Sequence, residues 1–387
     1  MRVVVIGAGI VGAACAAEAT AAGLDVTIVD RGPVGAGTTS RGEGNVLVSD
    51  KGPGLELDLA RLSRTLWDHW ADELGAARFE YESKGGLVVA TSAAAHEALT
   101  AFAATQAAAG VVTEPTAALH DLEPHLAEGL PGGVHYPEDA QVQPVLAAAA
   151  LLGAARRRGA RVVTGEVTGL DTGPGGRLRG IHLADGTAVP ADAVINAAGT
   201  WGGAVAARFG APLEILPRRG FVLVTVPLTP RVHHKVYSAD YVANVASSDE
   251  GLETSCVVEG TRGGTILIGA SRERVGFDPT MSPPVVARLA AQACALFPFL
   301  ADVRLLRTYR GFRPYSPDHL PVIGPDARVP GLLHACGHEG AGIGLAPATG
   351  ALVTAYLLGH PWRGAEPSAY AGLSPDRFLV AAAEGQS

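Results

Sequence analysis

Cysteine is scarce in this sequence of 387 residues, and its few copies lie far apart. The four cysteines are Cys15, Cys256, Cys294 and Cys336, and no two of them form a CxxC pair. This spacing excludes the clustered thiolates of a zinc or iron–sulfur site, and a chain of this length has no need of a disulfide scaffold. We therefore expect no metal site, and a reducing, cytoplasmic location fits the composition best.

Basic residues and long apolar runs are also missing. Lysine occurs only at Lys51, Lys84 and Lys235, and the net charge is −8. A nucleic-acid partner requires a basic face, so nucleic acid is excluded as the main partner. The apolar opening, residues 3–24, is interrupted by Glu18 and by glycines, and no later run reaches the length of a membrane span. We therefore expect no integral membrane segment.

The sequence does contain a clear alternation of strands and helices. Residues 2–6 have the pattern of a buried strand, residues 10–22 that of a helix, and residues 25–29 that of a second strand. Together they predict a βαβ unit. Apolar and polar side chains alternate over several segments of residues 214–275, which predicts an antiparallel sheet. Further helices are predicted at residues 55–75, 144–158 and 283–296.

The order of these elements predicts an α/β protein with two interleaved domains. The first is a Rossmann-like, dinucleotide-binding domain, assembled from residues 1–80, 141–213 and 306–387. The second is an α+β domain of residues 81–140 and 214–305, whose antiparallel sheet would roof the substrate site.

A dinucleotide fingerprint lies inside the βαβ unit. Gly7, Gly9 and Gly12 form GxGxxG directly after the first strand. The first glycine permits the tight turn, the second lets the backbone approach a pyrophosphate, and the third lets helix and strand pack closely. The helix N-terminus offers N–H groups and a positive dipole end to the phosphates. Asp30, at the end of the second strand, is placed to accept hydrogen bonds from a ribose. The fingerprint alone does not separate NAD from FAD.

Three further segments favour FAD. Residues 37–45 (GTTSRGEGN) follow the acidic residue and are rich in small and hydroxyl side chains. Residues 194–203 (VINAAGTWGG) read as a buried strand that ends in a glycine turn, and residues 334–350 as a glycine-rich turn that enters a helix. A nicotinamide dehydrogenase does not need three dispersed segments around one ligand. FAD is longer, and its flavin end is stabilised by a helix N-terminus where negative charge develops on reduction.

With these motifs the sequence resembles the FAD-dependent amino-acid oxidoreductases of the D-amino-acid oxidase, glycine oxidase and sarcosine oxidase group. The resemblance covers nearly the whole chain and rests on VVVIGAGIVG, VINAAGTW, RGFRPYSPDHLPVIG and GHEGAGIGLAPATG. SRGEGNVLVSDK and the GHEGAGIG turn look most similar to the flavin subunits of opine and D-hydroxyproline dehydrogenases and of hydrogen cyanide synthase. Those proteins often work with small iron–sulfur partners, so the resemblance implies a hetero-oligomer as an alternative to a homo-oligomer.

The resemblance also implies roles for individual residues. Arg313 matches the arginine that holds the substrate carboxylate, a task for which a planar, bidentate, always charged guanidinium is suited. Tyr241 and Tyr237 lie where the family often supplies a tyrosine hydroxyl to the same carboxylate, although an ordinary sheet tyrosine explains either position equally well. His338 lies in the flavin turn, where it either approaches flavin or substrate or is a hydrogen-bonded structural histidine.

Two positions depart from the family pattern. Gly340 stands where glycine oxidase has a second arginine, and Leu267 falls where sarcosine oxidases carry a lysine that promotes reaction with oxygen. The electron acceptor is therefore left open between oxygen and a partner protein. No cysteine is present in the RP loop to tether the flavin, so non-covalent FAD is expected. The residues expected to bind FAD are Gly7, Gly9, Ile10, Gly12, Asp30, Arg31, Thr38, Thr39, Ser40, Gly44, Asn45, Val167, Ala198, Gly199, Trp201, Gly311, Arg313, Gly337, His338, Gly340, Ala341, Gly342 and Ile343.

The expected reaction is oxidation of the C–N bond of a small amino acid or secondary amine. A hydride would pass from the α-carbon to flavin N5, and the resulting imine would hydrolyse in water. This chemistry needs positioning more than an acid–base pair, and no such pair is evident in the sequence. Three alternatives stay open: oxidation of a 2-hydroxy acid, an electron-passing flavin subunit active only in a complex, and a plain NAD-dependent dehydrogenase.

Overall fold

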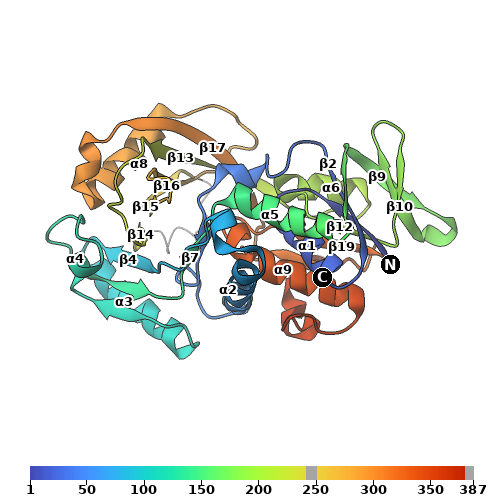
Figure 1. Cartoon of the computed structure of the whole chain (residues 1–387), viewed down its shortest axis with the longest axis horizontal. Helices are drawn as coiled ribbons and strands as arrows, with labels where there is room; N and C mark the ends of the chain where they lie inside the picture. Colours follow the sequence, from blue (N-terminus) through green and yellow to red (C-terminus); the bar gives the residue numbers. More distant parts are fainter. Residues whose placement is uncertain (241–250, 380–387) are drawn as a thin grey trace, which may run out of the picture.

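A computed structural model describes residues 1–240 and 251–379. Two sheets lie in separate lobes, at the right and left of Figure 1. The right-hand sheet has the strand order β18-β19-β12-β1-β2-β8, and all neighbours are parallel except β18 and β19. Its strands are β1 (Arg2–Ile6), β2 (Asp25–Asp30), β8 (Arg161–Thr164), β12 (Ala193–Asn196), β18 (Val322–Pro325) and β19 (Leu332–Cys336).

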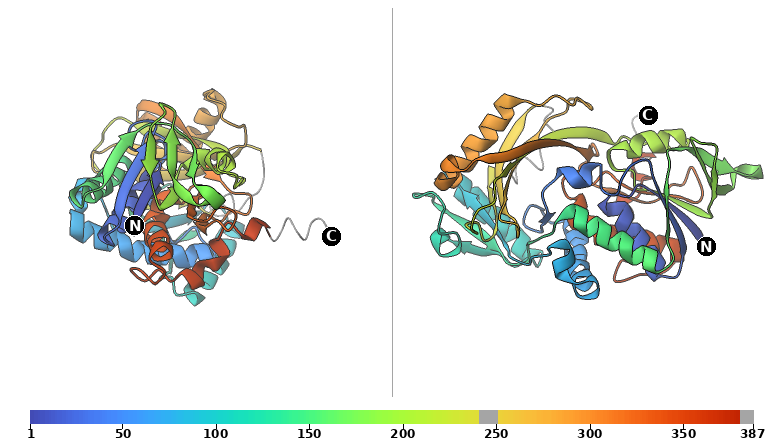
Figure 2. Two further views of the ribbon diagram at one scale, coloured as in Figure 1. Left: turned by 90° about the vertical axis from the view of Figure 1, so that its right-hand side faces the viewer. Right: turned by 45° about the horizontal axis from the view of Figure 1, so that its top comes forward.

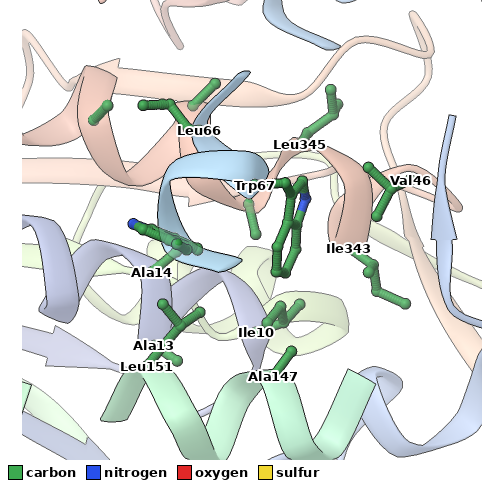
Figure 3. Close-up of a cluster of buried hydrophobic side chains, with 14 of the residues drawn as sticks. Ile10, Ala13, Ala14, Val46, Leu66, Trp67, Ala147, Leu151, Ile343 and Leu345 are labelled. Atoms are coloured by element: carbon green, nitrogen blue, oxygen red, sulfur yellow. The ribbon is translucent and has the colours of Figure 1, made fainter. Parts of the chain in front are cut away.

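A layer of helices from distant parts of the chain lies beside this sheet. They are α1 (Ile10–Ala21), α2 (Leu55–Leu74), α5 (Pro144–Arg157) and α9 (Gly342–Leu358). Helices α1 and α9 pack against the strands of the sheet, α5 packs on α1, and α2 packs on α9. Small side chains let α1 and α9 approach closely, since a Cβ at Gly350 would lie 2.7 Å from the carbonyl oxygen of Ala14. Trp67 of α2 is fully buried beside Ile343 and Ile10 (Figure 3). This apolar cluster fixes the start of α1 against the start of α9.

The left-hand sheet has eight strands in the order β17-β13-β16-β15-β14-β4-β6-β5. All neighbours are antiparallel except β14 and β4, which are parallel. Helix α8 (Pro283–Leu296) packs against β15 and β16, and α3 (Ala93–Ala108) against β6 and β4. The strands of the left-hand sheet are β4 (Gly86–Ala90), β5 (Glu114–Thr116), β6 (Gly132–Tyr136), β13 (Leu216–Thr225), β14 (Lys235–Ser238), β15 (Glu253–Gly260), β16 (Ile266–Arg272) and β17 (Leu305–Tyr315).

Smaller elements complete the fold. A three-stranded antiparallel sheet protrudes from the right-hand lobe, and a two-stranded ribbon lies between the lobes. None of the helices within residues 1–240 and 251–379 has both the length and the apolar character needed to cross a membrane. The remaining strands and short helices are β3 (Asn45–Val46), β7 (Ala140–Gln141), β9 (Val167–Thr172), β10 (Leu178–Leu183), β11 (Ala188–Pro190), α4 (Leu119–Leu122) and α6 (Gly202–Arg208).

The predicted α/β class is confirmed, as are the βαβ unit and the helices expected at residues 55–75, 144–158 and 283–296. One strand crosses the predicted division of the chain. β17 was expected to belong mostly to the dinucleotide-binding part, yet it pairs with β13 along nearly its whole length in the left-hand sheet. In Figure 2 this orange strand extends from the left-hand lobe toward the middle of the molecule. The domain boundaries themselves stay a prediction.

A buried carboxyl group ties the loop after β3 to the left-hand sheet. Asp139 is fully buried and accepts hydrogen bonds from the N–H groups of Val48, at 2.8 Å, and Ser49, at 3.3 Å. It also bonds the Ser49 hydroxyl, which in turn bonds the Tyr237 hydroxyl. Burial raises the pKa of Asp139 to about 7, although these hydrogen bonds act in the opposite direction.

This pKa gives a prediction about stability. The folded state holds the Asp139 proton more tightly than the unfolded chain does, so its contribution is complete below about pH 4 and is lost as the pH rises toward 7. Asp139→Asn should flatten the stability profile over this window by up to about 4 kcal/mol, measured by urea unfolding from pH 4 to 8. In the control Asp185→Asn, the affected carboxyl has a lowered pKa and titrates below this window. If stability fell with pH as steeply in Asp139→Asn as in the wild type, Asp139 would not be the source of this pH dependence.

Candidate active site

A long cavity runs from the carboxyl ends of β1 and β2 to the face of the left-hand sheet. Its walls come from the N-terminus of α1, the loop of residues 31–45, the turn after β12, and the turn between β19 and α9. Ligands of open parallel sheets bind outside the carboxyl ends of the strands, which is where this cavity begins. Residues from all four segments that the sequence placed beside the cofactor therefore line one cavity.

The fingerprint glycines are held by close backbone contacts. Gly7 has φ +110°, and a Cβ there would lie 2.4 Å from the carbonyl oxygen of Ala197. A Cβ at Gly12 would lie 2.0 Å from the carbonyl oxygen of Gly7, so strand and helix meet backbone to backbone. Gly9 is the N-cap of α1 and supplies no side chain to its first turn. The first turn of α1 lines the cavity, where the Thr39 hydroxyl accepts a hydrogen bond from Ile10 N–H at 3.0 Å. The N–H groups of this turn and the positive end of the helix dipole suit an anion.

Asp30 organises the turn as well as lining the cavity. One carboxylate oxygen accepts a hydrogen bond from Ala8 N–H at 2.6 Å, and the other accepts from Gly32 N–H at 2.8 Å. Each oxygen keeps a free lone pair that can accept from a hydroxyl group. The guanidinium of Arg31 lies 4.4 Å above the ring of Trp201, which covers this part of the cavity. The acid therefore fits the ribose position that the sequence assigned to it.

Three of the predicted segments meet at one carbonyl group. The hydroxyls of Thr38 and Thr200 both donate to the carbonyl oxygen of Phe312, at 2.8 and 2.9 Å. Their oxygen atoms lie 3.1 Å apart. The loop of residues 37–45, the turn of residues 194–203 and strand β17 are thereby fixed to each other beside the cavity.

His338 lies at the opposite end of the cavity and is buried. Its Nε2 lies 3.0 Å from the hydroxyl of Thr349, and that hydroxyl donates to the carbonyl of Leu345 at 2.9 Å. Since the hydroxyl proton is already engaged, Nε2 is the donor and carries the ring proton. Burial lowers the pKa of His338 to about 3, so the ring is neutral. His338 is a hydrogen-bonded wall residue in this geometry.

Arg313 projects from β17 into the same end of the cavity. Its Nη1 donates to the carbonyl oxygen of Ser271 at 2.8 Å, which fixes the direction of the guanidinium. The neighbouring Glu339 is paired with buried Arg218 at 2.6 Å. Burial alone would raise the pKa of Glu339, but the His319 hydrogen bond and the Arg218 charge lower it to about 2. Glu339 is therefore ionised and engaged with Arg218.

The structure brings most of the predicted site residues to this cavity. Tyr241 lies outside the described residues. Tyr237 is fully buried, and its hydroxyl bonds Ser49 rather than lining the cavity. Gly12, Ser40, Gly44, Gly337 and Ala341 lie behind the wall, while those that line it are Gly7, Gly9, Ile10, Asp30, Arg31, Thr38, Thr39, Asn45, Val167, Ala198, Gly199, Trp201, Gly311, Arg313, His338, Gly340, Gly342 and Ile343.

Several lining residues were not singled out from the sequence. Glu166 and Arg208 line the end nearest the fingerprint, and Arg41, Glu43 and Cys336 line the middle and far parts. Glu43 lay within the segment of residues 37–45 that was expected beside the cofactor, but nothing in that pattern showed which side chains point inward. Among the described residues, no group of three or more His, Cys, Asp or Glu side chains could hold a metal ion.

Comparison with known proteins decides the family. A model of the family described as FAD dependent oxidoreductase matches residues 2–356. The chain belongs to this family. FAD is therefore the cofactor of the cavity, and the chain is an FAD-dependent oxidoreductase.

The sequence is also similar to individual flavoproteins. The flavoenzyme is 32% identical over 237 residues to the hydrogen cyanide synthase subunit HcnC of Pseudomonas aeruginosa, covering 61% of this chain and 53% of that protein. It is 29% identical over 366 residues to glycine oxidase of Geobacillus kaustophilus, covering 91% of both. The match thus spans about half the length of the first relative and nearly all of the second.

Solved structures share the fold. Glycine oxidase from Geobacillus kaustophilus superposes with a TM-score of 0.82 at 27% identity, covering 93% of this chain and 95% of that one. L-proline dehydrogenase from P. horikoshii superposes with a TM-score of 0.86 at 22% identity, covering 98% of both. The second likeness, at this identity, shows the fold alone.

The described residues fit FAD. Gly7 and Gly9 line the cavity at the first turn of α1, and neither has room for a Cβ: one at Gly7 would lie 2.4 Å from the Ala197 carbonyl oxygen, and one at Gly9 would lie 3.2 Å from the Thr39 hydroxyl. Asp30 lines the cavity with carboxylate oxygens that could accept from a ribose, and the N-terminus of α9, with Gly342 in its first turn, lies at the far end. Between them the cavity spans both lobes, as a dinucleotide with a flavin requires.

Proposed function

We propose that this flavoenzyme oxidises the C–N bond of a small amino acid or secondary amine to an imine, which hydrolyses to a carbonyl compound and free amine. Arg313 carries the proposal, because it places a fixed guanidinium at the flavin end of the cavity. The relatives named glycine oxidase and hydrogen cyanide synthase subunit support a substrate of this class. Bound FAD supplies a two-electron acceptor for the hydride of the substrate α-carbon.

The chain's own residues would position the substrate. Arg313 would bind its carboxylate through charge-assisted hydrogen bonds and hold it in one orientation. Oxidation of a 2-hydroxy acid would instead require a base for the hydroxyl proton, typically a histidine. His338, the histidine that lines the described cavity, has a pKa of about 3 and donates its proton to Thr349. A ring of such low basicity is a poor base for a hydroxyl proton, which favours an amine substrate over a hydroxy acid.

We further propose that the flavin is held non-covalently and that a protein or dye accepts its electrons better than oxygen does. Cys336 lines the cavity, but burial raises the pKa of its thiol to about 12, so it is not a ready nucleophile. Leu267 of β16 replaces the lysine that promotes oxygen reaction in sarcosine oxidases. The alternative is a flavin subunit active only with partner subunits, which the likeness to HcnC, a subunit of hydrogen cyanide synthase, supports.

Product analysis tests the reaction class. Purified holoprotein is supplied with a panel of amino acids, secondary amines and 2-hydroxy acids, and with a redox dye as acceptor. Amine oxidation releases one ammonia or amine and one carbonyl compound for each electron pair that reaches the dye. Dye reduction by a hydroxy acid, without release of ammonia from any amine, would contradict the proposal. Comparing oxygen with the dye as acceptor in the same assay tests the proposed acceptor preference.

A further inference from the structure

We propose that Glu43 binds the amino group of the substrate, opposite Arg313, so that the site recognises an amino acid as a zwitterion. This inference rests on the proposed amino-acid substrate and adds to it a second recognition residue. Glu43 lies in the loop between η1 (Thr38–Arg41) and β3, and it lines the cavity at the same end as Arg313.

The first observation is that Glu43 is a buried carboxyl group with little internal compensation. Its exposed fraction is 7%, and its Oε1 accepts no hydrogen bond from any described residue. Its Oε2 has one long contact, 3.5 Å from Asn45 Nδ2. Buried carboxylates are normally hydrogen-bonded or paired, because their desolvation is costly. An orphaned oxygen that lines a ligand cavity is therefore expected to find its partner on the ligand.

The second observation is the placement of Glu43 relative to Arg313. A Cβ at Gly269 of β16 would lie 2.3 Å from Glu43 Oε1, and a Cβ at Gly220 of β13 would lie 2.3 Å from Arg313 Nη1. Each of these two side chains therefore lies directly against a glycine, and the two glycines belong to neighbouring strands of the sheet. The guanidinium of Arg313, in turn, is held by the carbonyl of Ser271, two residues after Gly269.

The other charges around Glu43 are engaged with one another. Lys235 and Glu259 form a fully buried ion pair, and Glu259 also accepts from Gly44 N–H at 3.1 Å. Burial, together with the nearby charge of Glu259, raises the pKa of Glu43 overall, and the charges of Lys235 and Arg313 offset only part of this rise. An ammonium group beside Oε1 would add a further favourable charge and a hydrogen-bond donor. The pocket therefore offers an acceptor for N–H groups on one side and donors for a carboxylate on the other.

This arrangement predicts which ligands the site should prefer. A substrate with both a carboxylate and an adjacent amine satisfies Arg313 and Glu43 together, and its α-carbon is held between them. A carboxylate without an amine leaves Glu43 buried and uncompensated, which disfavours its binding. A simple alkylamine offers no carboxylate for Arg313 to bind. The site should therefore discriminate against both incomplete ligands.

The test uses two probes of similar shape, neither of which can be oxidised as an amine, because neither has both an amine and a hydrogen on its α-carbon. 2-Aminoisobutyrate has the amine and the carboxylate but no α-hydrogen, and isobutyrate lacks the amine. Each is titrated into oxidised holoprotein, and binding is followed by the perturbation of the flavin absorption spectrum. Wild-type protein should bind 2-aminoisobutyrate more tightly. Glu43→Gln should weaken that binding about tenfold or more while leaving isobutyrate unchanged or tighter.

Two further variants separate recognition from folding. Glu43→Asp keeps the charge and should keep the preference for 2-aminoisobutyrate. Glu123 is the matched control, because it is also fully buried with an unpartnered Oε2 but bonds the N–H groups of His233 and His234 away from the cavity. Glu123→Gln should leave the ratio of the two affinities unchanged.

The outcomes that overturn the inference are distinct from failure of the proposed function. Equal weakening of both probes in Glu43→Gln, or no change in either, would show a structural role for Glu43. Wild-type protein that binds 2-aminoisobutyrate no more tightly than isobutyrate would also overturn it. Because neither probe is turned over as an amine, these results do not depend on oxidation, whereas failure of the proposed function appears as no flavin reduction by any amine.

Discussion

Arg313→Ala is expected to lower kcat/KM for a carboxylated amine and to leave the flavin content unchanged. The loss corresponds to about 2–5 kcal/mol of transition-state stabilisation. The guanidinium of Arg313 is oriented by the Ser271 carbonyl and lines the end of the cavity away from the fingerprint, where we propose that the substrate meets the flavin. Its removal leaves the substrate carboxylate desolvated without a partner, which raises the barrier as well as weakening binding. Steady-state kinetics with the best amino acid of the panel measures the effect.

Two controls make this result specific to the carboxylate. Arg307→Ala removes an arginine near the exposed end of the same strand, stacked on Tyr309, and should leave kcat/KM close to that of the wild type. The neutral amide of the same amino acid should lose little activity in Arg313→Ala, because it has no charge for the guanidinium to hold. If Arg313→Ala turned over the carboxylated substrate at the wild-type rate, Arg313 would not be its anchor.

Gly12→Ala is expected to yield protein that retains little FAD. The added Cβ would lie 2.0 Å from the carbonyl oxygen of Gly7, which is backbone and cannot rotate away. Helix α1 must then move away from β1, and its first turn leaves the phosphate position. Overpacking of this kind costs about 1–3 kcal/mol, which corresponds to FAD binding weakened by about 10- to 100-fold. The flavin-to-protein ratio after dialysis measures it.

The matched control is Gly169→Ala in β9. A Cβ at Gly169 would meet no atom within 4 Å, and the position needs no left-handed backbone. This variant should keep a full complement of FAD. Equal flavin content in Gly12→Ala and wild-type protein would contradict the close helix–strand contact that the cofactor site requires.

The dinucleotide end of the site could be predicted in detail because its determinants are local. Strand, glycine turn, helix and acidic residue follow one another within residues 2–30, and close backbone contacts explain Gly7 and Gly12. The sequence did not predict the direct bond from Ala8 N–H to Asp30, which depends on how the turn folds back on the strand, or the presence of Glu166 and Arg208 at this end of the cavity. The α/β class followed from the same periodicity.

The substrate end could not be predicted to the same depth because it is assembled across the sequence. Glu43 meets Gly269 over a separation of more than two hundred residues, and no local pattern reports such a contact. Tyr237 was a candidate for the substrate roof, but strand β14 turns it into the core, where it bonds Ser49. The stacking of Phe277 on Trp201, at 5.7 Å, likewise joins two segments that are unrelated in sequence.

The central claim is that this FAD-dependent oxidoreductase takes electrons from the C–N bond of an amino acid. It is tested most directly by recording the visible spectrum of purified holoprotein under anaerobic conditions while matched amines and hydroxy acids are added, such as alanine and lactate in both configurations. The account predicts that the oxidised flavin band bleaches with an amine and not with its hydroxy-acid counterpart. Bleaching by the hydroxy acid alone would contradict it.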